Sequence, residues 1–245
     1  MSDNKNCLGL IPARAGSKRV PKKNIKLLAG HPMIAYTISA ALKSGVFSRV
    51  IVSTESEEIK EIALKYGAEV PFLRPPEYAI DHSPDIEWIK HLLETFRDQR
   101  ETAEFFSILR PTNPFRQPET IIRAWKLFSA DDEADSLRAI EKCGQHPGKM
   151  WRLEGKYMKP IMENPDKNGT PWHSMQYQSL PEIYEQNASL EIARCSVPLE
   201  KGTIAGEKII PFITKGYEGF DINRPEDWMV AEYLIKNKMV KLPLI

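Results

Sequence analysis

The first half of the chain alternates between short apolar runs and longer segments with helical spacing. In the longer segments apolar residues recur every three or four positions, which indicates amphipathic helices. Such helices are expected over Pro32–Ser44, Glu57–Tyr66, Pro84–Arg100 and Pro118–Phe128. The short runs predict extended segments at Cys7–Ile11, Val50–Ser53, Glu69–Leu73, Phe105–Leu109 and Ser136–Ile140. This order is typical of a mostly parallel sheet covered by helices on both faces, so we expect an α/β fold.

The residue composition of the chain changes after about residue 145. Glycine, proline, asparagine and single aromatic residues dominate as far as Tyr184, with two short extended pieces. Strand and helix patterns then return at Asn187–Val197, Lys208–Ile213 and Arg224–Lys236. We therefore predict a single domain over residues 1–245, with an inserted arm at about residues 141–186.

Composition excludes several classes of protein. The chain has 34 basic and 33 acidic side chains, and this balance disfavours a dedicated nucleic-acid binder. We see no run of transmembrane length and no signal peptide, so we expect no membrane partner and a cytoplasmic location. The three cysteines are far apart and lack CxxC spacing, which disfavours a disulfide framework and a zinc site. Cys7 and Cys195 are interpreted as small core residues.

A basic loop, Ile11–Asn24 (IPARAGSKRVPKKN), follows the first predicted strand. Ligands in such sheets bind beyond the carboxyl ends of the strands, so the loop lies where a ligand is expected. Its three cations Arg14, Lys18 and Lys23 suit a long polyanion such as a triphosphate, with backbone donors at Ala15–Ser17. A solvated surface turn is the alternative. The loop has neither Walker nor GxGxxG spacing.

The loop resembles the signature of the acylneuraminate cytidylyltransferase family, and further landmarks of that family follow in order. Val52–Glu55 (VSTE) ends the second strand as in the family, although the family more often has Asp at the position of Glu55. The other landmarks are Arg74 to Asp85 (RPxxLAxDxSxxxD in the family), Leu109–Arg116 (LRPTNPFR, against LQPTSPLR), His146–Lys149 (HPGK, against HPxK) and Gly219–Asp227 (GFDINRPED, against IDIDTPED). The resemblance implies a three-layer, Rossmann-like nucleotidyltransferase fold whose inserted arm forms a homodimer.

The resemblance also implies a CTP site. Arg74 would donate to the cytosine carbonyl, and a backbone carbonyl near Ala13 would accept from the cytosine amino group. Arg74 has an alternative in an ion pair with Glu77 or Asp81. Asp81 and Ser83 would contact the ribose. The alternative for both is to cap the following helix, and Ser83 fits its N-cap with Pro84 at the first helical position. The expected CTP-binding residues are Ala13, Arg14, Ala15, Gly16, Ser17, Lys18, Lys23, Asn24, Arg74, Asp81 and Ser83.

Asp221 is the predicted ligand of Mg²⁺ (or Mn²⁺), because Mg²⁺ prefers one or two carboxylates together with substrate phosphates. Asn223 occupies the family's second carboxylate position, and an amide contributes an oxygen without a charge. Glu226 and Asp227 are expected in the first turn of the last helix. Arg14, Lys18, Lys23 and Asp221 are the predicted catalytic residues.

Met175–Ser189 resembles the family's sugar-binding segment QxLPxxYxxNGA. In sialic-acid members two arginines of this segment hold the sugar carboxylate, whereas this chain has Gln176 and Glu185. Another nonulosonate or an octulosonate is therefore as plausible as N-acetylneuraminate, and Lys149, Arg110 or Arg194 would supply the missing charge. The expected sugar-binding residues are Arg110, Thr112, Asn113, Lys149, Gln176, Gln178, Tyr184 and Asn187.

The predicted reaction is the activation of an acidic 2-keto sugar with CTP, which gives the CMP-sugar and pyrophosphate, for cell-surface polysaccharide biosynthesis. Two alternatives remain. One is a nucleotidyltransferase that uses another nucleoside triphosphate and a sugar phosphate. The other is a non-catalytic nucleotide-sugar-binding protein, for which Asn223 is the only support.

Overall fold

The computed structural model describes residues 6–245, which divide into two compact units. The larger one, here called the main unit, comprises the described residues as far as Ala139 together with Asn187–Ile245. The smaller one, here called the arm, comprises Ile140–Gln186.

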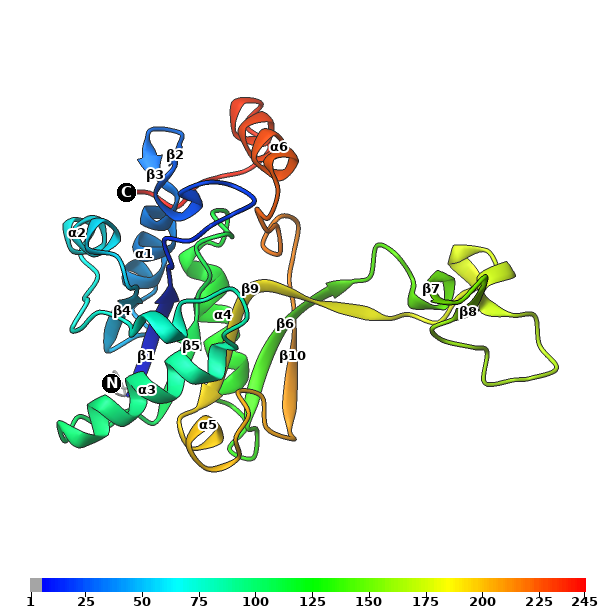
Figure 1. Cartoon of the computed structure of the whole chain (residues 1–245), viewed down its shortest axis with the longest axis horizontal. Coiled ribbons are helices and arrows are strands. Elements are labelled where there is room, and N and C mark those ends of the chain that lie inside the picture. The colour runs from blue at the N-terminus through cyan, green and yellow to red at the C-terminus, as the bar shows by residue number, and fades with distance from the viewer. Residues whose placement is uncertain (1–5) are drawn as a thin grey trace. The chain divides into compact units, whose positions relative to one another are not determined.

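A six-stranded sheet forms the centre of the main unit, with the order β10-β6-β9-β5-β1-β4 (Figure 1). β1 is parallel to both of its neighbours, β4 and β5. β9 runs antiparallel to β5, with Ile108 opposite Glu191. The strands are β1 (Cys7–Pro12), β4 (Arg49–Ser53), β5 (Phe105–Ile108), β6 (Ser136–Lys142), β9 (Tyr184–Arg194) and β10 (Ile209–Ile213).

Different helices cover the two faces of the sheet. A strand such as β1 contacts both sets of helices, because successive strand residues point to opposite faces. In β1, Leu8 and Leu10 belong to the hydrophobic cluster of α3, whereas Cys7 and Ile11 belong to the cluster of α1, α2 and α4. A third cluster joins α6 to the segment after the basic loop. The helices are α1 (Met33–Ser44), α2 (Glu57–Lys65), α3 (Asp85–Asp98), α4 (Pro118–Phe128), α5 (Ser196–Glu200) and α6 (Pro225–Lys236).

Local chemistry accounts for where several helices begin and end. The hydroxyl of Ser56 accepts a hydrogen bond from the Ile59 amide at 3.4 Å and caps the start of α2. Gly45 ends α1 with φ of 63°, a conformation that glycine adopts without strain. Asp227 lies in the first turn of α6, where it accepts from the amides of Asn223 and Arg224, both at 2.8 Å. Glu226 and Asp227 therefore confirm the first-turn prediction.

The arm contains the antiparallel hairpin β7 (Trp151–Glu154) and β8 (Tyr157–Pro160). Buried His146 joins its segments: the ring accepts from the Gly148 amide at 2.9 Å and lies 3.1 Å from the Pro181 carbonyl oxygen.

The short elements of the chain are η1 (Lys23–Ile25), β2 (Leu27–Leu28), β3 (His31–Pro32), η2 (Pro76–Tyr78), η3 (Pro147–Lys149), η4 (Trp172–Ser174) and η5 (Tyr177–Ser179).

The α/β fold class and the mostly parallel sheet are confirmed, and three of the expected strands need correction. Glu69–Leu73 is not a strand, since only Glu69 forms an isolated bridge with Ile51. The strand expected at Asn187–Val197 begins earlier, at Tyr184, and ends at Arg194, and β6 extends to Lys142. The antiparallel direction of β9 was not predicted. No helix among residues 6–245 is both long and apolar enough to span a membrane.

Candidate active site

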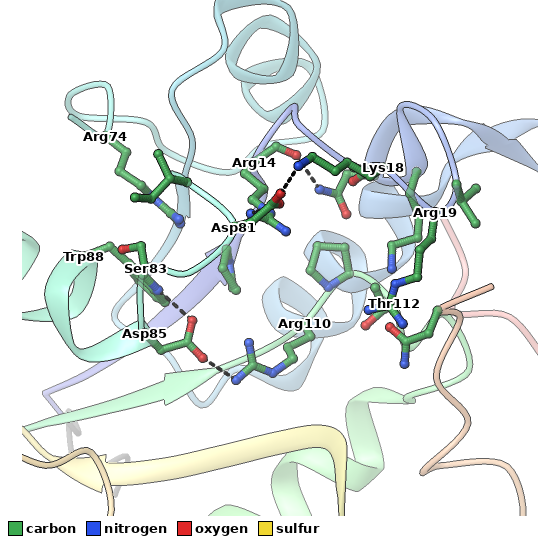
Figure 2. Close-up of a pocket in the computed structure, with 18 of the residues that line it drawn as sticks. Arg14, Lys18, Arg19, Arg74, Asp81, Ser83, Asp85, Trp88, Arg110 and Thr112 are labelled. Carbon is green, nitrogen blue, oxygen red and sulfur yellow. Dashed lines mark hydrogen bonds and ion pairs between the residues drawn. The ribbon is translucent and has the colours of Figure 1, made fainter. Parts of the chain in front are cut away.

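A cavity of about 330 Å³ lies in the main unit, beyond the carboxyl ends of β1 and β5 (Figure 2). It is the kind of position where α/β sheets bind ligands. Its walls come from the basic loop, the segment around η2, the start of α3, the turn after β5 and the loop before α6. The predicted site residues that line it are Arg14, Ser17, Lys18, Lys23, Asn24, Arg74, Asp81, Ser83, Arg110, Thr112, Asp221 and Asn223.

Asp81 neutralises part of the basic loop. Its two carboxylate oxygens pair with Arg14, at 2.9 Å, and with Lys18 (Figure 2). The hydrogen bond from Lys18 is the main reason that the pKa of Asp81 is lowered. Two of the predicted phosphate-binding cations therefore hold an internal carboxylate.

Three backbone donors of the loop are bonded within the protein. The Ala13 amide donates to the Ser53 carbonyl, and the Ser17 amide to the Ala15 carbonyl, at 2.9 and 2.8 Å. The Ala15 amide donates to the Glu55 carboxylate at 2.7 Å. Ala13, Ala15 and Gly16 are not among the lining residues, and a Cβ at Gly16 would meet no atom within 4 Å. The space around Gly16 would therefore also admit a residue with a side chain.

Lys23 and Asp221 lie together at another part of the wall. Lys23 donates to the Ile222 carbonyl at 2.7 Å, and burial lowers the pKa of its ammonium group although the Asp221 charge opposes the shift. One oxygen of Asp221, Oδ2, accepts from the Asn223 side-chain amide. The other, Oδ1, is buried without a hydrogen-bond partner. An orphaned carboxylate oxygen on the wall of the cavity fits a divalent cation that takes its remaining ligands from substrate phosphates.

Arg74 is a buried cation supported by Ser53. Its guanidinium donates to the Ser53 hydroxyl and carbonyl at 3.0 and 2.9 Å and lies 4.8 Å from the ring centroid of Trp88. Burial lowers its pKa to about 10. The alternative of an ion pair with Glu77 or Asp81 is wrong, because the partner oxygens come from Ser53 and Tyr78.

Ser83 does not cap α3. The helix begins at Asp85, one residue later than predicted, and extended Pro84 holds the N-cap position. The Ser83 hydroxyl instead donates to the Glu87 carboxylate at 2.5 Å. Proline therefore occupies the cap and not the first helical position, which corrects the predicted arrangement.

The turn after β5 contributes Arg110 and Thr112. Arg110 donates through Nη2 to Asp85, at 2.6 Å, and to Glu191, at 3.0 Å. The Thr112 carbonyl accepts from the Ile222 amide at 2.9 Å, which ties this turn to the loop of Asp221. Buried Asn113 does not line the cavity: it accepts from the Arg116 amide and donates to the Glu218 carbonyl. Asn113 is thus a residue of the turn's internal structure.

Comparison with known proteins gives the chain a family. Residues 8–145 match the family described as Cytidylyltransferase. The chain belongs to this family. It is 34% identical over 233 residues to CMP-N,N'-diacetyllegionaminic acid synthase of Legionella pneumophila, covering 94% of this chain and 96% of that protein.

Other relatives and solved structures agree. The chain is 30% identical to N-acylneuraminate cytidylyltransferase of Streptococcus agalactiae, over 95% of its own length and 55% of that protein, so it spans about half of that relative. The structure of CMP:2-keto-3-deoxy-manno-octonic acid synthetase complexed with CTP is similar, with a TM-score of 0.69. That likeness covers 95% of this chain and 99% of the other at 15% identity, so it shows the nucleotidyltransferase fold.

The remaining predicted sugar-binding residues of this cytidylyltransferase are divided between the two units. In the arm, Lys149 donates to the Met175 carbonyl at 2.6 Å, and the Tyr184 hydroxyl donates to Glu182 at 2.9 Å. Gln176 precedes η5, and Gln178 lines a cavity of about 260 Å³ within the arm. In the main unit, Asn187 donates to the Thr214 hydroxyl, and Arg194 donates to the carbonyls of Ala134 and Asp132. Asn187 and Arg194 are not among the lining residues of the main cavity.

Eight lining residues were not predicted as site residues from the sequence. The charged or aromatic ones among them are Arg19, Tyr78, Asp85 and Trp88. Arg19 and Asp85 lie within the motifs quoted above, so their place in those motifs could have predicted that they belong to the site. Trp88 carried no signal beyond its helical spacing. The buried cysteines agree with the core interpretation, since burial raises the pKa of the Cys195 thiol to about 12.

Proposed function

We propose that this cytidylyltransferase couples CTP to an acidic 2-keto sugar of the nonulosonate or octulosonate class. The anomeric hydroxyl of the sugar attacks the α-phosphorus of CTP. The bond from that phosphorus to the bridging oxygen breaks, pyrophosphate leaves and the hydroxyl proton is released. The relatives of the chain, which include legionaminic and acylneuraminic acid enzymes, support this substrate class.

The observation that carries the proposal is the convergence of Arg14, Lys18 and Lys23 on one cavity with Asp221. Phosphoryl transfer is accelerated mainly by positioning and by neutralising the charge that spreads over the phosphates. The three cations would stabilise the leaving pyrophosphate. Because Lys23 is partly buried, its charge is screened less by water than that of exposed Lys18.

Asp221, with the side-chain oxygen of Asn223, would hold Mg²⁺ or Mn²⁺. When bound, the metal ion would neutralise phosphate charge and help to align the α-phosphate. Among the described residues no cluster of three or more His, Cys, Asp or Glu side chains forms a metal site. The protein's own ligand set is thus small, as is usual where phosphates complete the coordination of Mg²⁺.

The nucleoside end would lie near Arg74 and Ser83. Arg74 is held in place by Ser53, so its orientation is set before a ligand arrives. A guanidinium donor suits the cytosine carbonyl, and Ser17 and Asn24, which line the cavity, would frame the phosphates. Asp81 stays a candidate for the ribose, although its observed partners are Arg14 and Lys18.

The test is pyrophosphate release with each of CTP, UTP, GTP and ATP, and with a panel of acidic 2-keto sugars. Arg14→Ala and Lys23→Ala should each lower turnover by about 10²- to 10³-fold, the loss expected for one charge-stabilising donor. Lys22→Ala is the matched control, because Lys22 stands in the same loop but pairs with Glu58 at 2.8 Å. Near-normal turnover of both Arg14→Ala and Lys23→Ala would refute the assignment.

We also propose that the protein acts in the cytoplasm, as a homodimer formed through the arm, in cell-surface polysaccharide biosynthesis. The β7–β8 hairpin supports the dimer, because Leu153, Tyr157 and Met158 are 80, 69 and 53% exposed. Neighbouring exposed apolar side chains of this size are typical of protein–protein contacts. A second copy of the chain is the partner proposed for this surface.

A further inference from the structure

We propose that Arg110 binds the carboxylate of the acceptor sugar, an inference that rests on the proposed function. Arg110 lines the cavity and belongs to a charged cluster of the main unit that is separate from the basic loop. In the view of Figure 2, Arg110 and Asp85 lie at the opposite end of the cavity from Arg14 and Lys18. The cluster consists of Asp85, Arg110, Arg116, Arg138 and Glu191.

The side chain of Arg110 is fixed by two carboxylates from distant elements. Asp85 opens α3 and is itself held by a 2.9 Å hydrogen bond from the Trp88 indole. Glu191 lies in β9, is nearly fully buried, and pairs also with Arg138 of β6. A solvated surface arginine has no need of such support, whereas binding sites require supported side chains.

The backbone of Arg110 is fixed as well. Its carbonyl accepts from the Arg116 guanidinium at 3.2 Å and lies 3.5 Å from the Thr37 hydroxyl oxygen. Arg116 also donates to the Thr37 hydroxyl and to the Ser189 carbonyl. Arg116 and Glu191 are therefore positioning residues that hold Arg110 in one orientation.

The cluster has one positive charge in excess, since it contains three arginines and two carboxylates. Arg116 is completely buried and, among the described residues, hydrogen-bonds only to neutral oxygens. Burial lowers the pKa of Arg116 to about 9. The charge of nearby Asp221 opposes this shift, but the same charge also acts on Lys23. A buried excess cation is costly, so an anion bound at the exposed edge of the cluster would be stabilised.

Arg110 has donors left for that anion. Nη2 makes both of its ion pairs, while Nε and Nη1 have no hydrogen-bond partner in the described part of the chain. A planar guanidinium matches a carboxylate with two parallel hydrogen bonds. The polyanionic leaving group has its own cations at the basic loop, so the remaining anion of the reaction, the sugar carboxylate, fits Arg110.

The test separates binding of the sugar from binding of CTP. Steady-state pyrophosphate release is measured with CTP, Mg²⁺ and four acids: N-acetylneuraminate, N,N'-diacetyllegionaminate, pseudaminate and 2-keto-3-deoxy-manno-octonate. The acid converted best is then compared with its methyl ester. Arg110→Gln removes the charge and puts in the residue that the resembled motif has there. Arg97→Gln, at the other end of α3, removes an equally charged exposed side chain as the control.

We expect Arg110→Gln to raise KM for the acid by about 10- to 100-fold, the range of one charged hydrogen-bonded contact. KM for CTP should stay within about twofold, and the preference for the acid over the ester should disappear. Arg110→Lys should give a KM for the acid between those of the wild-type enzyme and Arg110→Gln. It replaces Arg110→Gln in the test if that variant does not fold. Glu191→Gln should raise KM for the acid without changing the fold seen by circular dichroism.

Two other results would overturn the inference. An undiminished preference for the acid in Arg110→Gln, or an equal rise of both KM values, would show that Arg110 does not hold the carboxylate. In both of these cases the wild-type enzyme still converts the acid, so the proposed function stands. Failure of the wild-type protein to release pyrophosphate with any of the acids would instead refute the proposed function and this inference with it.

Discussion

Replacing Asp81 by Asn tests whether this carboxylate competes with the triphosphate. Asp81 pairs with two of the three cations assigned to the phosphates, Arg14 and Lys18. An incoming triphosphate must take these cations away from Asp81. Asp81→Asn keeps the size of the side chain and removes its charge, so CTP should bind more tightly.

The magnitude follows from the exposure of the two ion pairs. The side chains of Arg14 and Lys18 are 35 and 82% exposed, so water screens both pairs. Each exposed pair corresponds to a factor of about 1.4 to 5 in an equilibrium constant. We therefore expect CTP and pyrophosphate to bind about 2- to 25-fold more tightly, and the gain should shrink at high salt.

Isothermal titration calorimetry with CTP and with pyrophosphate gives the answer. Pyrophosphate has no ribose, so tighter binding of both ligands locates the effect at the phosphates. Glu77→Gln is the control, since it removes the same charge four residues away and outside the cavity lining. If Asp81→Asn weakens CTP while pyrophosphate is unchanged, Asp81 binds the ribose and the competition argument is wrong.

Two further predictions concern the metal ion and the arm. Asp221→Asn should raise the Mg²⁺ concentration needed for half-maximal turnover by at least about tenfold, because it removes the only charged metal ligand proposed here; an unchanged Mg²⁺ titration would count against Asp221. Sedimentation at micromolar concentration should give a dimer for the wild-type chain, and the paired change Leu153→Asp with Tyr157→Asp should shift it towards the monomer by placing charges on the exposed hairpin. A wild-type monomer at that concentration would refute the dimer.

Much of the fold followed from patterns that are local in the chain. The helices at Pro118–Phe128 and Met33–Ser44 match the predicted ranges almost residue for residue, because each has a continuous apolar face and a clear start or end. Glu69–Leu73 failed as a strand because a short apolar run does not specify a partner along its whole length. The direction of β9 could not be predicted either, since a strand's pattern is the same in both directions.

For the site, too, local sequence patterns were predictive and contacts between distant residues were not. The amino-acid sequence by itself placed a basic loop after a strand and put Arg14, Lys18, Lys23 and Asp221 in recognisable motifs, because those motifs are contiguous. Only the tertiary structure showed that Asp81 pairs with Arg14 and Lys18, and that Glu191 holds Arg110 across 81 residues of chain. The physical reason is that an ion pair depends on distance in space. The chain order lists the charges, and the packing of the sheet and α3 decides which of them meet.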